Sequence, residues 1–129
     1  MLNKSHVYVL VHKDKKYLKI GKANVLEDRI SSLEKSWGGF DKKESFAYIV
    51  PERSVIRLEK FLHEFFCNDR YYNLPKKDGY TEMFKISILP ALKDLLKKMA
   101  GVKSKFEMEI RTLTKFVSRT NVSQGLIDL

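Results

Sequence analysis

Three residues have side chains suited to phosphate chemistry, and each lies at the edge of an apolar pattern. Tyr8 is in the middle of a segment rich in β-branched residues. Arg29 precedes Ile30 in a helical pattern, and Glu59 follows Leu58 in a second one. Ionisable residues at the margin of a core-facing surface usually have a partner or a function. Either the three form a site, or Arg29 and Glu59 form an ordinary ion pair between two helices.

The strands expected to position these residues follow from β-branched and aromatic segments. The first two flank the polar turn Lys13–Lys16 and should form a hairpin. A third strand is closed by Pro51. A short fourth strand is predicted further on. The predicted strands are residues 6–12, 17–21, 46–50 and 82–86.

Apolar residues at helical spacing predict the helices. The first should begin after Asn24, a suitable N-cap with Glu27 three residues on, and end near Ser36 before two glycines. A last helix should carry Phe106, Ile110, Leu113 and Val117 on one face. The other predicted helices are residues 52–66 and 89–99.

The order of elements predicts an α+β fold: a small three-stranded, mainly antiparallel sheet flanked by helices, with added C-terminal helices. A length of 129 residues fits one modest core. We expect the main domain at residues 1–100. Residues 101–129 should form a C-terminal helix and tail, either packed on the domain or used in oligomerisation.

The composition is strongly basic, with a formal net charge of +9. This excess favours a polyanionic partner, nucleic acid first and an anionic membrane surface second, although a basic surface can also serve solubility alone. The single cysteine, Cys67, cannot form an internal disulfide. It follows Phe65 and Phe66, so we expect a buried structural thiol. No apolar run approaches the roughly 20 residues of a membrane span, and no signal peptide is visible. We expect an intracellular protein, in the cytoplasm or, if viral, in that of the host.

The ordered motifs resemble the GIY-YIG nuclease family. His6-Val7-Tyr8 and Lys19-Ile20-Gly21 resemble its paired strand motifs, with Tyr8 and Lys19 eleven positions apart. Arg29 and Glu59 match the helix arginine and the metal-binding glutamate of that family. Thr81-Glu82-Met83-Phe84 resembles the element that closes the domain. The Lys-Ile-Gly motif is typical of a branch found in phage, viral and fungal proteins, and the resemblance covers about residues 6–86.

The resemblance implies a set of roles in phosphodiester hydrolysis. Glu59 would hold one Mg²⁺ or Mn²⁺ ion that keeps most of its waters. Arg29 would contact the scissile phosphate with its planar donor fork. Tyr8 would position or deprotonate the attacking water.

Lys19 departs from the family pattern, because many members have a tyrosine there. It could be a cation that binds phosphate and helps Tyr8 to lose its proton, or the site could have lost part of its catalytic set. Tyr17, two positions earlier on the same strand face, could partly replace the missing phenol.

Two further residues have two interpretations each, and two more have one. His63, four residues after Glu59, is either a second base or orienting group of the catalytic set, or a half-buried surface histidine. Glu82 is either a second carboxylate of the site or the partner of a lysine, and we favour the pairing. Asn73 is a weak candidate for a polar site residue supplied by its loop. His12 is treated as an exposed turn residue.

Lysines around the first helix and in the following loop are candidates for contacts with phosphates, which give affinity without sequence information. Aromatic residues Trp37, Phe40, Tyr71 and Tyr72 could stack on splayed bases, although a core role is favoured for the first two. The candidate nucleic-acid-binding lysines are Lys22, Lys35, Lys42, Lys43, Lys76 and Lys77.

We therefore expect a metal-dependent endonuclease that hydrolyses phosphodiester bonds in DNA with low or structure-based specificity. The alternatives are a catalytically weak nucleic-acid-binding module and an interaction protein that reuses the fold. The last helix could pair with a second copy, which would let a nuclease with one site cut both strands.

Overall fold

A five-stranded antiparallel sheet forms the centre of the molecule, in the order β4-β2-β1-β3-β5. The structure, a computed structural model, describes residues 3–72, 74–77, 79–101 and 109–112. The strands are β1 (Lys4–His12), β2 (Tyr17–Ala23), β3 (Phe40–Pro51), β4 (Met83–Lys85) and β5 (Glu109–Thr112).

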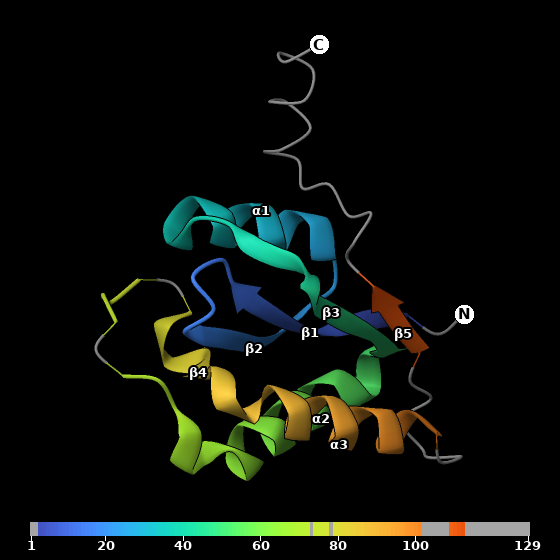
Figure 1. The fold of residues 1–129 in the computed structure, drawn as a ribbon. Coiled ribbons are helices and arrows are strands. Elements are labelled where there is room, and N and C mark those ends of the chain that lie inside the picture. Colours follow the sequence, from blue (N-terminus) through green and yellow to red (C-terminus); the bar gives the residue numbers. More distant parts are fainter. Residues whose placement is uncertain (1–2, 73, 78, 102–108, 113–129) are drawn as a thin grey trace.

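Helices cover both faces of the sheet, as Figure 1 shows: α1 lies on one face, and α2 and α3 lie on the other. Their bounds are α1 (Leu26–Trp37), α2 (Glu52–Phe65) and α3 (Leu89–Gly101). Short 3₁₀ turns are η1 (Cys67–Asp69), η2 (Tyr80–Glu82) and η3 (Ile86–Ile88). Within the described residues, no helix combines the length and the hydrophobicity that crossing a bilayer requires.

The central strand β1 is apolar from Val7 to Val11 because these residues are buried on both faces of the sheet. Val7 and Val9 face the α2 and α3 side, whereas Tyr8 and Leu10 face α1. A strand with both faces covered needs a continuous apolar run in place of simple alternation. This arrangement places the Tyr8 phenol inside the molecule, under α1.

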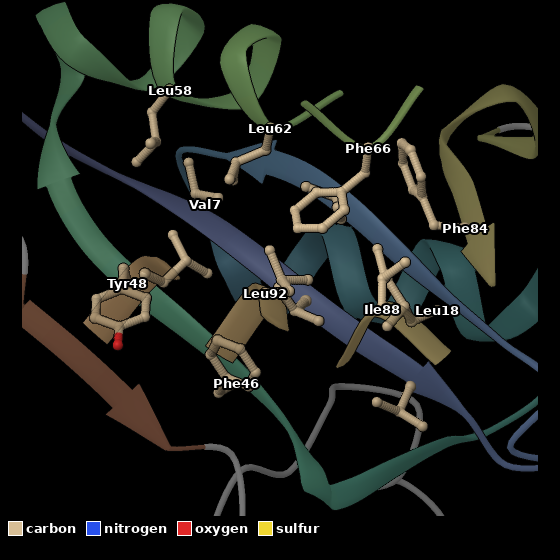
Figure 2. Close-up of a cluster of buried hydrophobic side chains, with 14 of the residues drawn as sticks. Val7, Leu18, Phe46, Tyr48, Leu58, Leu62, Phe66, Phe84, Ile88 and Leu92 are labelled. Carbon is tan, nitrogen blue, oxygen red and sulfur yellow. The ribbon is translucent and has the colours of Figure 1, made fainter. Parts of the chain in front are cut away.

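The larger core lies between the sheet and the α2–α3 layer (Figure 2). Leu58 and Leu62, one helical turn apart on α2, point into it together with Leu92 of α3. The remaining faces of α2 are therefore free to carry polar groups, and Glu59 and His63 lie on them.

The predicted α+β class with an antiparallel sheet and flanking helices is confirmed. The sheet has two edge strands, β4 and β5, beyond the three that the fold prediction counted, and β3 begins six residues earlier than the predicted residue 46. The division between residues 1–100 and 101–129 stays a prediction.

The predicted last helix is wrong over Glu109–Thr112, where the chain forms β5. This segment pairs with β3, with Ile110 opposite Tyr48. The edge of β3 would otherwise present unpaired backbone groups, and pairing satisfies them. The other residues of that predicted helix, Phe106, Leu113 and Val117, lie outside the described residues. The homodimer through this helix therefore stays a prediction.

The predicted N-cap is also wrong. The cap position of α1 is Val25, and no side chain caps the helix. Asn24 instead accepts a hydrogen bond from the Ser5 hydroxyl at 2.8 Å, which ties the end of β2 to the start of β1. The Asn24 side chain therefore bonds to Ser5 of β1, although the local sequence favoured it as the cap of α1.

Cys67 and His12 are the reverse of what was expected. Cys67 is exposed, because α2 ends at Phe65 and Phe66 turns into the core in its place. His12 is buried, with its ring stacked on Tyr17 at 4.6 Å and its Nε2 bonded to the Trp37 carbonyl at 2.7 Å. Cys67 lies just past the end of α2, and His12 is the last residue of β1. In both cases the end of the element decides whether the side chain is buried.

Candidate functional site

Tyr8 and Arg29 meet beneath α1. The Tyr8 residue is 0 % exposed, and its hydroxyl accepts a hydrogen bond from Arg29 Nε at 3.3 Å. Arg29 itself is half-buried. The guanidinium is therefore the part of this pair that an approaching phosphate would meet first, with the phenol oxygen behind it.

Gly21 makes room for the phenol. It is the cross-strand partner of Tyr8, and a Cβ at this position would overlap the Tyr8 hydroxyl. Any larger residue would have to displace the ring or push the strands apart. The glycine of the Lys-Ile-Gly motif is thus required by the position of Tyr8.

Lys19 is 0 % exposed, and its ammonium forms an ion pair with Glu82. The Glu82 side chain is 30 % exposed, so this pair lies at the border between core and solvent. Gly79, in a left-handed conformation, closes over the lysine: a Cβ there would lie 2.8 Å from Lys19 Cε. The favoured pairing of Glu82 with a lysine is the one observed.

The buried ammonium also connects to Tyr8. Lys19 Nζ lies 5.4 Å from the centre of the Tyr8 ring, within the range of a cation–π contact. Tyr17 lies on the same face and in the same core cluster as Tyr8, but its ring contacts are with His12 and Tyr71. Burial first, and then the nearby Asp14 carboxylate, raise the pKa of Tyr17.

His63 joins α2 to the open edge of β2. Strand β4 pairs with β2 along Tyr17–Lys19, and within the described residues no strand pairs with this edge of β2 from Ile20 onward. His63 Nε2 donates a hydrogen bond to the Ile20 carbonyl at 2.8 Å. Nε2 carries the hydrogen in this contact, because the carbonyl can only accept. The contact also holds in place the turn of α2 that carries Glu59.

Glu59 is half-buried on that turn, near a second carboxylate. Burial raises its pKa, and repulsion from Glu82 raises it further; His63, Lys22 and Lys19 act in the opposite direction. Two carboxylates that repel each other in a partly buried place form a setting that a cation would stabilise.

The described residues contain no cluster of three or more histidine, cysteine, aspartate or glutamate side chains that could hold a metal ion. A dedicated all-protein cage of that kind is therefore not seen in this part of the chain. A donor set of one or two carboxylates still suits Mg²⁺, which needs oxygen ligands and usually keeps several waters.

The candidate lysines lie on β2, α1, β3 and the loop that precedes η2. Lys22, Lys35, Lys43, Lys76 and Lys77 are exposed, and Lys42 is half-buried. Lys77 Nζ bonds to the Ser36 carbonyl at 2.8 Å and lies 5.4 Å from the Trp37 ring. The loop that carries Lys76 and Lys77 is thus held against the end of α1.

The predicted site residues fall into two connected groups. One is Arg29 and Tyr8 under α1, and the other is Glu59 and His63 on α2 at the edge of β2. Lys19 and Glu82 lie between them, through the Tyr8 ring contact on one side and the repulsion of Glu59 on the other. Trp37 and Phe40 are buried, as favoured, and Asn73 lies outside the described residues.

Two contributions escaped sequence reasoning. No role was predicted for Gly79, although its left-handed conformation packs it on Lys19. Arg70 received no role, yet it bonds to the Thr81 carbonyl and lies over the Phe84 ring at 5.4 Å. For Gly79, the signal available in the sequence was its position three residues before the candidate carboxylate Glu82.

In a comparison with known families, the model of the T5orf172 domain matches residues 5–120. Comparisons with curated proteins and with solved structures found no significant match.

Proposed function

The chain belongs to the T5orf172 domain family, a nuclease-related family, and we propose that it is a metal-dependent endonuclease of the GIY-YIG kind that hydrolyses phosphodiester bonds in DNA. The observation that carries the proposal is a continuous series of contacts. It runs from Arg29 through Tyr8 and Lys19 to Glu82, whose charge acts on Glu59.

Arg29 and Tyr8 supply the phosphate-binding and water-orienting part of the reaction. The guanidinium offers planar N–H donors to the scissile phosphate and stabilises the charge that develops on its oxygens. Its Nε–H holds the Tyr8 oxygen in place. The phenol hydroxyl can also donate one hydrogen bond and accept a second, so it can orient a water molecule beside the phosphate.

Glu59 supplies the metal-binding part. Its half-buried carboxylate, with Glu82 nearby, fits one Mg²⁺ or Mn²⁺ ion bound mainly through waters. When bound, such an ion polarises the phosphate and stabilises the leaving oxygen. His63 sets the position of Glu59 through its bond to the Ile20 carbonyl.

Lys19 acts in this proposal as a positioning residue. Its ammonium is buried and paired with Glu82, so it faces the protein and not the solvent from which a phosphate would approach. It supports the Tyr8 ring from one side and directs the Glu82 carboxylate on the other. A lysine can therefore stand where other members carry a tyrosine without copying its hydroxyl.

The test is cleavage of supercoiled plasmid in the presence of Mg²⁺ or Mn²⁺, followed by branched and flapped DNA. Wild-type protein should nick or linearise DNA, and Glu59→Gln should not, while both bind DNA in EDTA with equal affinity. The matched control is Glu64→Gln, since Glu64 is an exposed carboxylate on the same helix. It should cleave like the wild type.

Other outcomes identify the alternatives. Binding without cleavage by any of these proteins on any substrate would overturn the enzymatic proposal in favour of a binding module. A lack of affinity for DNA and RNA at low salt would leave an interaction protein that reuses the fold. The net charge of +9 predicts that any affinity falls steeply with salt.

A further inference from the structure

A small aromatic pocket lies beside the candidate site, at the β4 edge of the sheet. Its volume is about 190 Å³, and its lining is mainly apolar. Its lining includes three tyrosines, Leu74, Met83 and Arg70; the tyrosines are Tyr71, Tyr72 and Tyr80.

The walls of the pocket are tied together by the backbone. The Tyr71 N–H bonds to the Met83 carbonyl at 2.9 Å, and Arg70 bonds to the Thr81 carbonyl. Tyr71 also packs against Tyr17 of β2, with ring centres 5.1 Å apart. A pocket held in this way is already formed before anything binds, which lowers the entropic cost of binding.

Two of the three tyrosines in the lining, Tyr72 and Tyr80, are exposed to solvent. Tyr72 is 70 % exposed and Tyr80 is 38 % exposed. A scattered exposed aromatic needs no explanation, but here both exposed rings line one hollow. Proteins that bind single-stranded nucleic acid combine a positively charged surface with aromatic rings on which bases stack.

The pocket adjoins the proposed catalytic groups. Thr81 and Met83, both in its lining, flank Glu82, which pairs with Lys19. Met83 is also the cross-strand partner of Lys19. A group bound in the pocket would therefore contact the same short segment, residues 81–83, that carries Glu82.

We propose that this pocket takes one unpaired nucleobase of the DNA substrate, stacked against Tyr72 and Tyr80. The volume agrees with this occupant: a cavity of roughly 150 Å³ accommodates a benzene ring, whereas drug-sized ligands need about 300 Å³ or more. A pocket of about 190 Å³ thus holds one planar ring system. The tyrosine hydroxyls can bond to the polar edge of a base.

This inference rests on the proposed function and adds the substrate class. A base within an intact duplex is stacked and cannot enter, unless it is extruded at a cost of a few kcal/mol. The pocket therefore favours DNA that already has an unpaired nucleotide, such as a flap, an overhang or a branch point.

The experiment is binding in EDTA, so that its result does not depend on cleavage. The probe is a duplex with a short single-stranded flap that carries 2-aminopurine, compared with a blunt duplex of the same sequence. Wild-type protein should bind the flap about tenfold tighter than the duplex, and stacking should quench the 2-aminopurine fluorescence. Tyr72→Ala and Tyr80→Ala should each lose most of this preference and the quenching, while Tyr72→Phe keeps both.

The control is Phe61→Ala, since Phe61 is 40 % exposed on α2 and does not line the pocket. It should bind both probes like the wild type. Equal affinity of wild type for flap and duplex would overturn the pocket proposal, even if plasmid cleavage is observed. Equal loss of flap and duplex binding in Tyr72→Ala would overturn it as well. A flap preference without any cleavage would support the pocket and overturn the enzyme.

Discussion

The Tyr8 hydroxyl lies against the backbone of Gly21, its partner across the β1–β2 pair, so closely that a Cβ on Gly21 would overlap it. The same hydroxyl accepts the bond from Arg29. One contact between two strands therefore decides where the phenol, and the guanidinium above it, can be.

The first prediction concerns this contact. Gly21→Ala should displace the Tyr8 ring, lower the free energy of unfolding by about 1–3 kcal/mol, and reduce cleavage about a hundredfold. Urea unfolding and single-turnover cleavage measure the two effects. Gly39→Ala is the control, because the nearest atom to its added Cβ would be 3.8 Å away. Wild-type activity in Gly21→Ala would show that the position of Tyr8 does not matter for cleavage.

The second prediction concerns the ion pair of Lys19 and Glu82. Lys19 is fully buried, whereas the Glu82 side chain is 30 % exposed. Without Glu82, the buried Lys19 ammonium loses its ion-pair partner and stays out of reach of solvent. Without Lys19, the Glu82 carboxylate can still be hydrated. Glu82→Met should therefore destabilise more than Lys19→Met, by up to about 3–5 kcal/mol for the larger effect.

The double variant Lys19→Met/Glu82→Met separates this explanation from simple loss of packing. It should be more stable than Glu82→Met alone, because no unpaired charge remains. Additive losses in the double variant, measured by urea unfolding at pH 7, would contradict the assignment of a buried pair.

The third prediction is a pH dependence from Glu59. Its pKa is raised, mainly by burial and then by Glu82, so the folded state favours the protonated form. Its contribution to stability is therefore full below the ordinary value near 4.5 and is lost as the pH rises through the raised pKa. Glu59→Gln should melt at a higher temperature than wild type at pH 7, and the difference should close towards pH 4.5. A lower melting temperature for the variant at pH 7 would show that Glu59 is stabilised as a carboxylate.

The fourth prediction is the effect of metal on stability. A divalent ion that binds the folded protein at ten times its Kd adds about 1.4 kcal/mol to the free energy of unfolding. Mg²⁺ or Mn²⁺ should raise the Tm of wild type and Glu64→Gln but not that of Glu59→Gln, and EDTA should reverse the rise. An equal rise in all three proteins would place the ion away from Glu59.

The fifth prediction separates two roles of His63. Loss of its bond to the Ile20 carbonyl in His63→Ala should cost about 1 kcal/mol and lower cleavage through the position of Glu59. His63→Gln can donate an N–H to the same carbonyl, so it should restore most of the stability and of the activity. A stable but inactive His63→Gln, with a changed pH–rate profile, would favour a direct role in proton transfer.

The local sequence pattern was enough to predict the strands and the helix that carry the candidate site. The β-branched segments around Lys13–Lys16 give the hairpin, and the apolar spacing of Leu58 and Leu62 gives α2. These features are local, because periodicity reports which face of a strand or helix is buried. The position of Glu59 and His63 on the remaining faces of α2 follows from it.

Which distant residues and strands pair with one another was decided only by the tertiary structure. Lys19 and Glu82 are 63 positions apart, and they pair because β4 docks on β2 and brings η2 over the buried ammonium. Likewise, Glu109–Thr112 forms β5 because the edge of β3 supplies unpaired backbone groups. Periodicity cannot identify such partners, since a buried charge or an open strand edge is satisfied by whatever the folded chain brings to it.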